Sequence, residues 1–401
     1  MNSETAIQSN ESKVNFYFTR HLTKSPDTFN ASIDERDEMY QFFLKNYNAD
    51  KARAVYHYLT SGKQSMNVIT QICNWHFKGI ENVSSFLDFA SGYGRFTRFL
   101  VQELSHDKVW VSDIYADALQ FQKDQFGVQA ISSAHDPNEF KVGLSFDFIF
   151  VASLFSHLPE VTFSQWLRRL YELLSSGGVL VFSVHDNAVI PASLLVGREA
   201  SNDDSFLFAP VSESGSLDKN EYGCMYVSEA FVGRVVKSIS GTANYFRVPK
   251  GLWNYQDIYV VTKNSISDFG KLNISSGPLG FLDKFYFTET GDFVLEGWAV
   301  ELNYSLHLES IEIFINDSLA YRCVVSEEFF ERPDVVAIYK ETALGYDADS
   351  FLKSGFRCCI DPRKFELSLS DVVLVKAVNS NNIECILRVD TLESVLTRGI
   401  A

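Results

Sequence analysis

The feature that most constrains this 401-residue chain is a short apolar run ending in a glycine turn, Phe86-Leu-Asp-Phe-Ala-Ser-Gly-Tyr-Gly-Arg-Phe96. Its first four residues are apolar except for Asp88, which predicts a buried strand of a parallel sheet. Gly92 and Gly94 lack a Cβ atom, so the backbone can turn sharply and approach a ligand closely. A helix is expected to begin at Arg95. Ligands of open α/β sheets bind beyond the carboxyl ends of the strands, so this turn is a candidate binding site.

The spacing Asp-x-Ala-x-Gly-x-Gly distinguishes two kinds of ligand. A dinucleotide site would have three glycines and a pyrophosphate at the helix N-terminus. Here Ala90 replaces the first glycine and Asp88 precedes it, which disfavours a phosphate and favours a cationic or hydroxyl-rich ligand. An ordinary strand-to-helix turn is the simpler alternative. The segment resembles motif I of class I S-adenosylmethionine-dependent methyltransferases, whose usual form is Asp/Glu-x-Gly-x-Gly-x-Gly.

Two later acids match positions that bind the cofactor in that family. The strand Lys108–Ile114 ends near Asp113, and an acid there can accept two hydrogen bonds from ribose hydroxyls. The resemblance implies that Asp113, with Ile114 beside it, holds the ribose, while Asp117 caps the next helix. After a third strand, Asp136 matches the residue that binds the adenine amino group. A turn residue ahead of Pro137 is an equally good interpretation of Asp136.

The next elements extend the resemblance. Ser145–Ala152 is nearly all apolar, as a central parallel strand should be, and opens into Ser153–Pro159. Gly177-Gly178 then precedes an apolar fifth strand, Val179–Val184. This order resembles motifs IV to VI of the same family, so the resemblance covers about residues 86–184. It implies a Rossmann-like seven-stranded α/β sheet, S-adenosylmethionine as cofactor, and a cofactor-binding set of Asp88, Ala90, Gly92, Gly94, Asp113, Ile114 and Asp136.

Methyl transfer from a sulfonium requires the acceptor to be aligned and, for a hydroxyl acceptor, a proton to be removed. His157 and His185 follow the fourth and fifth strands, and an unperturbed histidine pKa of about 6.5 suits a general base. Packing roles for both are the alternative, and Asp186 and Tyr222 are secondary candidates. Residues 188–226 are expected to form a loop that recognises the acceptor. No metal is needed for this chemistry.

These observations predict a methyltransferase that acts on a small-molecule or saccharide acceptor, through O-methylation. Two alternatives remain open at this stage. The enzyme could methylate nitrogen in an amino sugar or another amine, which needs less help from a base. The chain could also be a non-catalytic scaffold protein with a retained cofactor pocket.

The chain is expected to contain two domains. Residues 1–32 look poorly ordered, and residues 33–263 form the methyltransferase domain with a helical cap at 33–80, where Ser61-Gly62 ends one helix. Residues 264–276 read as a linker, and 277–395 as a smaller all-β sandwich of short strands. Gly297-Trp298 and Arg332-Pro-Asp-Val335 resemble an accessory domain beside bacterial enzymes of surface-polysaccharide clusters. That resemblance implies a structural or sugar-contacting module. A stacking platform for a ligand is one role open to Trp298, and a buried place in the core is the favoured alternative.

Charge and composition narrow the class of partner. The formal net charge of −16 opposes binding to nucleic acid and to anionic membranes. No run approaches the roughly 18 apolar residues of a membrane span, and the polar N-terminal residues lack the apolar core of a signal peptide, so a cytoplasmic location is expected. The six cysteines form no Cys-x-x-Cys pair, which predicts reduced thiols and no metal site. The sequence does not indicate an oligomeric state.

Overall fold

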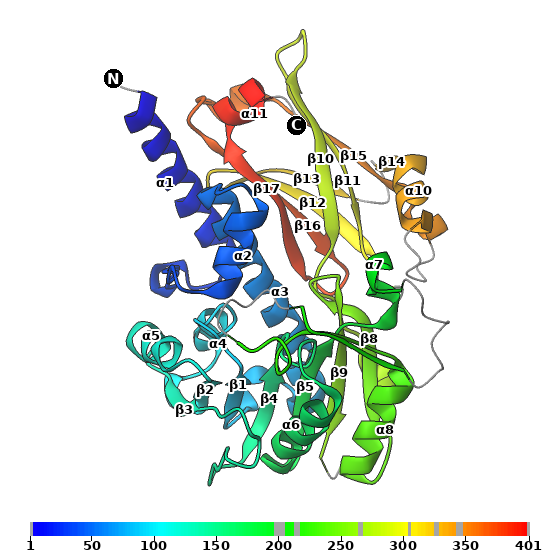
Figure 1. The fold of residues 1–401 in the computed structure, drawn as a ribbon. Helices are drawn as coiled ribbons and strands as arrows, with labels where there is room; N and C mark the ends of the chain where they lie inside the picture. Colours follow the sequence, from blue (N-terminus) through cyan, green and yellow to red (C-terminus); the bar gives the residue numbers. More distant parts are fainter. Residues whose placement is uncertain are drawn as a thin grey trace. The chain divides into compact units, whose positions relative to one another are not determined.

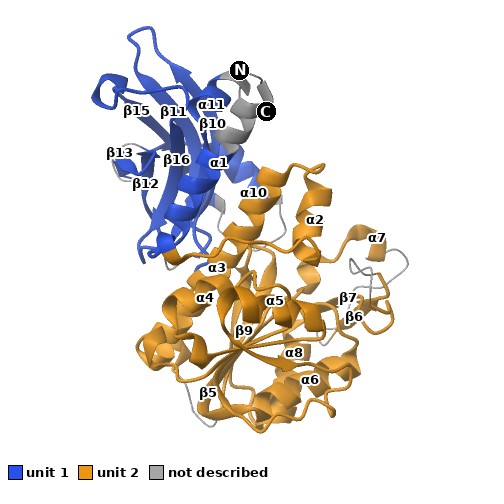
Figure 2. Cartoon of the chain, turned by 90° about the vertical axis from the view of Figure 1, so that its left-hand side faces the viewer, with its two compact units in different colours: residues 1–27, 275–401 blue, residues 28–274 orange. Residues whose placement is uncertain are grey.

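The computed structural model describes residues 3–195, 205–211, 217–263, 268–303, 306–324, 329–341 and 348–398. The chain divides into two compact units (Figures 1 and 2). Residues 28–274 form one unit. Residues 1–27 and 275–401 form the other, so the two ends of the chain belong to the same unit. None of the described helices is long and apolar enough to span a membrane.

The unit of residues 28–274 is built on a seven-stranded sheet of order β3-β2-β1-β4-β5-β9-β8. Strands β1 to β5 pair in parallel, and β9 and β8 close the sheet antiparallel to β5 and to each other. This confirms the predicted Rossmann-like sheet. Since parallel strands end at the same edge, the loops after β1, β2, β4 and β5 lie along one rim. The strands are β1 (Phe86–Phe89), β2 (Val109–Asp113), β3 (Gln129–Ser132), β4 (Phe146–Val151), β5 (Leu174–Val184), β8 (Tyr245–Leu252) and β9 (Gln256–Thr262).

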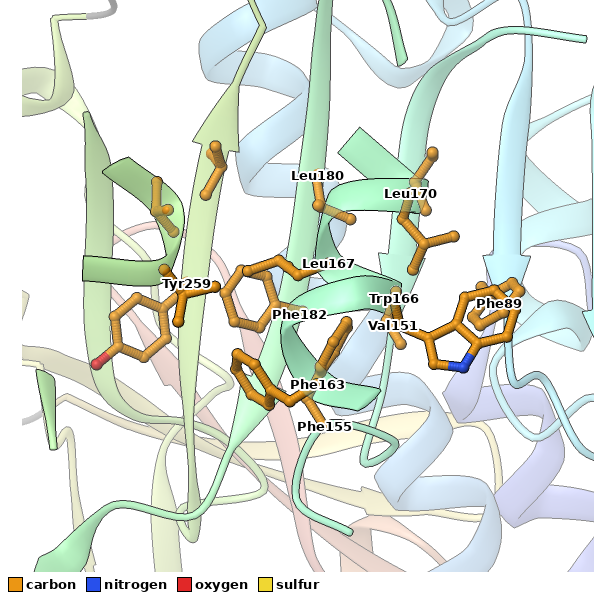
Figure 3. Close-up of a cluster of buried hydrophobic side chains, with 14 of the residues drawn as sticks. Phe89, Val151, Phe155, Phe163, Trp166, Leu167, Leu170, Leu180, Phe182 and Tyr259 are labelled. Atoms are coloured by element: carbon orange, nitrogen blue, oxygen red, sulfur yellow. The ribbon is translucent and has the colours of Figure 1, made fainter. Parts of the chain in front are cut away.

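Helices cover this sheet through one large apolar core. Aromatic and aliphatic side chains of α6 (Glu160–Glu172) pack on strand residues such as Phe182 and Tyr259 (Figure 3). Burial of each such side chain contributes about 1.5–3 kcal/mol, which holds the strands and the loops at their ends in place. The other helices of the sheet are α4 (Thr97–Glu103), α5 (Ala116–Phe126) and α8 (Glu229–Ser240), and a short α7 (Ala192–Leu195) precedes the antiparallel pair β6 (Phe206–Ala209) and β7 (Cys224–Val227).

The helical cap differs from the prediction at Gly62. Helix α2 (Glu38–Asn46) is followed by one continuous helix α3 (Lys51–Phe77), which does not end at Ser61-Gly62. A Cβ atom on Gly62 would collide with the Arg95 carbonyl oxygen and lie 2.8 Å from the Phe99 ring. Gly62 therefore lets α3 approach the turn before α4 closely. Glycine costs about 1 kcal/mol within a helix, and the close packing offsets that cost.

The second unit contains two four-stranded antiparallel sheets, of order β10-β11-β15-β14 and β13-β12-β16-β17. Side chains from both sheets, among them Phe293, Phe356, Ile313 and Val375, share one core. This confirms the predicted all-β domain. The strands are β10 (Leu279–Phe287), β11 (Phe293–Val300), β12 (Leu308–Ile315), β13 (Ser318–Val324), β14 (Phe329–Glu331), β15 (Lys353–Ile360), β16 (Val372–Asn379) and β17 (Glu384–Thr391), with helices α10 (Pro333–Glu341) and α11 (Leu392–Arg398).

The N-terminal residues form helix α1 (Ser3–Leu22), which differs from the expected poorly ordered N-terminus. Phe18 and Leu22 are buried, and the Lys13 ammonium donates to the Ser370 carbonyl oxygen at 2.7 Å. Arg20 pairs with Asp317 at 2.9 Å. Because these partners lie about three hundred residues away, the sequence near α1 did not reveal them. Of the expected linker at 264–276, residues 264–267 lie outside the described residues.

Candidate active site

The turn after β1 holds three residues with left-handed backbone. Ala90, Gly92 and Gly94 have φ angles of 59°, 56° and 77°. A Cβ atom on Gly92 would have no neighbour within 4 Å, so the space beside this backbone is open to a ligand. A Cβ atom on Gly94 would instead lie 2.5 Å from the Phe126 ring. Gly94 therefore makes room for helix α5 of the protein itself.

Asp88 is buried beneath this turn, with only 3% of its surface exposed. One carboxyl oxygen accepts a hydrogen bond from the Thr97 hydroxyl at 2.7 Å. Burial raises the pKa of Asp88 to about 7, and the nearby charge of Asp113 adds to the rise. The carboxyl group is thus poised to titrate near neutral pH. Nothing in the sequence pattern indicated that Thr97, the first residue of α4, would be its partner.

Asp113 joins the end of β2 to the glycine turn. Its Oδ2 accepts from the Gly92 N–H at 2.7 Å, and its Oδ1 accepts from the Tyr115 N–H at 3.0 Å. Burial raises the pKa of Asp113, while the backbone N–H groups oppose the rise. Each carboxylate oxygen can accept a second hydrogen bond, so the group can still bind ribose hydroxyls. Ile114 follows, partly exposed.

The predicted capping role of Asp117 is wrong. Helix α5 begins after Tyr115, which makes no side-chain cap. The Asp117 carboxylate instead accepts from the Tyr93 hydroxyl at 2.7 Å and from Arg36 at 2.9 Å. These contacts tie the glycine turn to the helical cap.

Gln122 of α5 is a further support of the turn that the sequence did not indicate. Its amide nitrogen donates to the Ser91 hydroxyl at 2.8 Å and to the Gly92 carbonyl oxygen at 2.7 Å. The side chain is fully buried. Together with Asp113, it fixes the backbone on either side of the open space at Gly92.

Asp136 lies in the loop after β3 and is exposed. Its Oδ1 accepts from the backbone N–H and the side-chain amide of Asn138, at 2.9 Å and 2.8 Å. The side chain thus stabilises the turn around Pro137. Contact with an adenine group stays a prediction.

The structure brings the two candidate histidines together at the ends of β4 and β5. Their ring centroids lie 6.0 Å apart in an edge-to-face arrangement. Both are buried, with 9% of His157 and 6% of His185 exposed. Among the described residues, no group of three or more His, Cys, Asp or Glu side chains is placed to hold a metal ion.

The His157 ring is held in one protonation form. Its Nδ1 lies 2.7 Å from the Gly223 carbonyl oxygen. A carbonyl can only accept, so Nδ1 carries the proton and Nε2 keeps its lone pair. The ring stacks on Tyr222 at 4.5 Å, and burial lowers the pKa of His157, so the imidazole is neutral at pH 7.

His185 is bound differently. Its Nε2 lies 3.2 Å from the Gln256 amide nitrogen, which donates, so the lone pair on Nε2 is already occupied. Gln256 also donates to the Ser153 hydroxyl at 2.9 Å, and its oxygen accepts from Ser183 at 2.6 Å. Burial, aided by His157, lowers the pKa of His185 to about 4, and the nearby Met225 carbonyl opposes this only weakly. Gln256 and Asp257 are two polar residues at the start of the mostly apolar strand β9, which was the one sequence signal that could have singled out Gln256.

The secondary candidates have structural partners. Asp186 pairs with Arg247 at 2.9 Å, and Arg247 also binds Asp257 at 2.7 Å.

Of the expected acceptor loop, residues 196–204 and 212–216 lie outside the described residues. Its end is described: the Gly223 N–H donates to the His157 carbonyl oxygen at 2.9 Å. The loop thus holds both the backbone and the ring of His157.

Residues 87–180 match the family model described as a methyltransferase domain. The match runs from β1 into β5 and includes the glycine turn, Asp113 and His157. It confirms the methyltransferase domain that the motifs predict. The protein is therefore an enzyme, and S-adenosylmethionine is its cofactor.

Several solved structures resemble part of the chain. A plantazolicin methyltransferase is 13% identical, covers 65% of this chain and 99% of its own, and has a TM-score of 0.38. An amino pentose methyltransferase from Micromonospora echinaspora is 14% identical (51% and 91% covered, TM-score 0.35). The magnesium protoporphyrin IX methyltransferase from Synechocystis PCC 6803 is 12% identical (52% and 87% covered, TM-score 0.35). No curated protein matches the chain. Likenesses at this level carry no information about the acceptor.

Proposed function

We propose that this enzyme transfers the methyl group of S-adenosylmethionine to an oxygen atom of a small-molecule or saccharide acceptor, with His157 as the general base. The observation that carries this proposal is the hydrogen bond from His157 Nδ1 to the Gly223 carbonyl oxygen. It leaves Nε2 as an unprotonated acceptor on a neutral ring at physiological pH. A general base is needed to remove the proton of a hydroxyl acceptor, whereas an amine acceptor needs much less assistance from a base.

The cofactor is assigned to the rim formed by the ends of β1 and β2. The open space at Gly92 lets the cofactor approach the backbone, and the Asp113 carboxylate accepts from the ribose hydroxyls. When it is ionised, Asp88 supplies a buried negative charge, which suits a cationic ligand. In this proposal Ala90, Gly94 and Gln122 shape the turn, and Ile114 and Asp136 would contact the nucleoside.

S-adenosylmethionine, held at Gly92 and Asp113, would supply the electrophilic methyl group, and the residues at the ends of β4 and β5 would align the acceptor oxygen with it. His157 Nε2 accepts the hydroxyl proton, and Nδ1 stays hydrogen-bonded to Gly223 so that the ring keeps its orientation. Tyr222, stacked on the ring, limits its rotation. General bases of this kind contribute about 10²–10⁴-fold to a rate.

His185 is assigned a positioning role. Its acceptor nitrogen is occupied by Gln256, which also binds Ser153 at the start of the loop that carries His157. Ser153 has a φ angle of 61°, an uncommon conformation for a residue with a side chain, so the loop depends on these contacts. The two histidines therefore differ in role although they lie at the same rim.

A labelled-methyl assay with sugar, lipid and small-molecule pools identifies the acceptor and then tests the base. We expect His157→Ala to lower kcat by roughly 10²–10⁴-fold and to leave cofactor affinity unchanged by calorimetry. The matched variant His185→Ala should have a smaller effect on kcat, which Gln256→Ala should reproduce. Near-normal turnover in His157→Ala would contradict the assignment of His157 as the base. It would favour an amine acceptor, or catalysis by alignment of the acceptor with the methyl group and no base.

A further inference from the structure

Arg95, which follows the second glycine of the turn after β1, carries a positive charge without an acidic partner. Among the described residues, no carboxylate forms an ion pair with its guanidinium. Asp37 and Asp88 act on this charge only from beyond ion-pair distance. Each of these acids already has a partner, since the Tyr58 hydroxyl donates to Asp37 at 2.6 Å and the Thr97 hydroxyl to Asp88 at 2.7 Å. The charge of Arg95 is therefore available to an anion.

Most of the donor groups of Arg95 have no acceptor in the protein. A guanidinium has five N–H groups. In the part of the chain that the structure describes, Arg95 makes one hydrogen bond, from Nη1 to the Ser61 hydroxyl at 3.3 Å. Its other nitrogen atoms keep exposed surface, so a ligand can reach them. Burial lowers the pKa of Arg95, which means that water solvates the charge poorly and that a bound anion would stabilise it.

Three elements fix the orientation of this guanidinium. Its Cζ lies 4.2 Å from the centre of the Trp253 ring, in the turn between β8 and β9. The Trp253 Nε1–H donates to the Ser61 carbonyl oxygen at 2.9 Å and to the Ser65 hydroxyl at 3.1 Å. Helix α3 thus holds both Arg95 and the ring on which it stacks. A guanidinium stacked in this way presents its edge in one plane, which suits two parallel hydrogen bonds to a carboxylate or phosphate.

The turn that carries Trp253 has a strained backbone. Lys250, Trp253 and Asn254 have φ angles of 52°, 56° and 56°. Positive φ angles are uncommon for residues with a side chain and rarer still for bulky ones. Such positions cost stability and cluster at ligand sites, where the shape of the backbone is needed. Here the shape of the turn places the indole ring against Arg95.

The contact with Trp253 places the guanidinium on the histidine side of the glycine turn. In the sheet, β2 with Asp113 lies on one side of β1, and β4, β5 and β9 follow on the other. Trp253 shortly precedes β9, whose first residues pair with the end of β5. Tyr255 of the same turn contacts the His185 ring edge-to-face at 5.1 Å. Arg95 therefore reaches away from the ribose position and toward the strands whose loops carry the two histidines.

We propose that the methyl acceptor carries an oxyanion, such as a carboxylate or phosphate group, which Arg95 binds through the exposed edge of its guanidinium. This acceptor class rests on the proposed methyl transfer and narrows it to an anionic, hydroxylated molecule. The oxyanion would be anchored beside Trp253, with the reacting hydroxyl toward His157. Because the net charge of −16 repels anions, a local cation is required to hold such an acceptor. The anchor would also align the reacting oxygen.

Anion-exchange fractionation of the acceptor pools tests the acceptor class. The label from S-adenosylmethionine should enter the anionic fraction and not the neutral one. With the purified acceptor, Arg95→Gln should raise KM about 10–100-fold and change kcat little, because a charge-assisted hydrogen bond is lost. Arg95→Lys keeps the charge without the planar fork and should recover part of the loss. Arg53→Gln is the matched control, since Arg53 stacks on Tyr47 at 4.4 Å near the start of α3.

Two titrations separate the acceptor from the cofactor as the source of the oxyanion. S-adenosylhomocysteine carries an amino-acid carboxylate, and 5′-methylthioadenosine lacks it. Arg95→Gln should bind both compounds as the wild type does, and circular dichroism checks that the variant is folded. Weaker binding of S-adenosylhomocysteine, with normal binding of 5′-methylthioadenosine, would mean that Arg95 holds the cofactor. That result would overturn the proposal, as would an unchanged KM in Arg95→Gln.

The outcomes distinguish an error in the acceptor class from an error in the proposed function. Methyl transfer to the neutral fraction alone overturns the anionic acceptor and leaves methyl transfer itself standing. If no fraction takes up the label, binding decides instead. Phenylglyoxal modification of Arg95, followed by peptide mass spectrometry, is then compared on protein saturated with S-adenosylhomocysteine. The anionic fraction should slow this modification and the neutral fraction should not, and equal rates with both overturn the proposal.

Discussion

At the scale of single residues, we expect Asp88 to link cofactor binding to pH. Its folded pKa of about 7 lies well above that of an exposed aspartate, and burial is the main cause. The folded protein therefore holds this proton more tightly than the unfolded chain. The stability that protonation contributes is complete below about pH 4 and is lost as the pH rises through about 7.

The same titration predicts a change in affinity. S-adenosylmethionine is cationic at sulfur, so the ionised form of Asp88 should bind it better. Between pH 6 and pH 8 the ionised fraction of such a group rises roughly tenfold, which sets the upper limit on the gain in affinity. Calorimetry should show the increase in the wild type and a flat profile in Asp88→Asn. Equal pH dependence in both proteins would assign the effect to another group.

Asp113 gives a second prediction for a single residue. Asp113→Ala should weaken cofactor binding by about 1–3 kcal/mol, because the ribose hydroxyls lose a buried acceptor and the Gly92 N–H loses its partner. Asp117→Ala is a suitable control, since Asp117 contacts Tyr93 and Arg36 at the outer side of the turn. Titration calorimetry that finds unchanged affinity in Asp113→Ala would remove this acid from the site.

At the scale of elements, the two glycines of the turn between β1 and α4 have different roles. Both Gly92 and Gly94 have positive φ angles, so alanine at either position bears a similar backbone cost of about 1–2 kcal/mol. Ala90 shows that the turn tolerates one such residue. The two sites differ in space, because only a Cβ on Gly94 would meet Phe126.

We therefore expect Gly94→Ala to lose more stability than Gly92→Ala, by about a further 1–3 kcal/mol from overpacking. Gly92→Val should stay folded and lose cofactor binding, since its side chain would occupy the open space. Thermal unfolding and calorimetry on the three variants measure the two effects separately. Normal cofactor binding by Gly92→Val would mean that the turn is only structural.

At the scale of the whole molecule, the two compact units are not consecutive in the sequence, because residues 1–27 belong to the same unit as residues 275–401. Helix α1 belongs with the β sandwich, through Lys13, Arg20 and the buried Phe18. A fragment of residues 28–274 should therefore fold and bind cofactor as the full chain does. A full chain that lacks residues 1–27 should keep cofactor binding and unfold its β sandwich at a lower temperature.

Limited proteolysis and calorimetry check these two expectations. The informative comparison is between fragments 28–274 and 1–274, which differ only in α1. The longer fragment should expose the apolar side of α1 and aggregate more readily. If the fragment of residues 28–274 failed to fold, the division into units would not describe independent domains.

The sequence by itself determined the sheet and the edge of the sheet at which the candidate site residues lie. The alternating strands and helices, the glycine turn and the acid after the second strand are local patterns, and local backbone and burial preferences are enough to specify them. They also predicted two histidines at one rim, since parallel strands end at the same edge.

The tertiary structure decided what the local pattern left open. Gly62 taken alone predicts the end of a helix. In the structure α3 continues through Gly62, and the glycine is needed there because the Arg95 carbonyl oxygen leaves no room for a Cβ atom. His157 and His185 look equivalent in the sequence, yet a backbone carbonyl leaves one with a free lone pair and an amide occupies the other. Such differences depend on partners far away in the chain, brought close only when the core forms, and no local propensity encodes them.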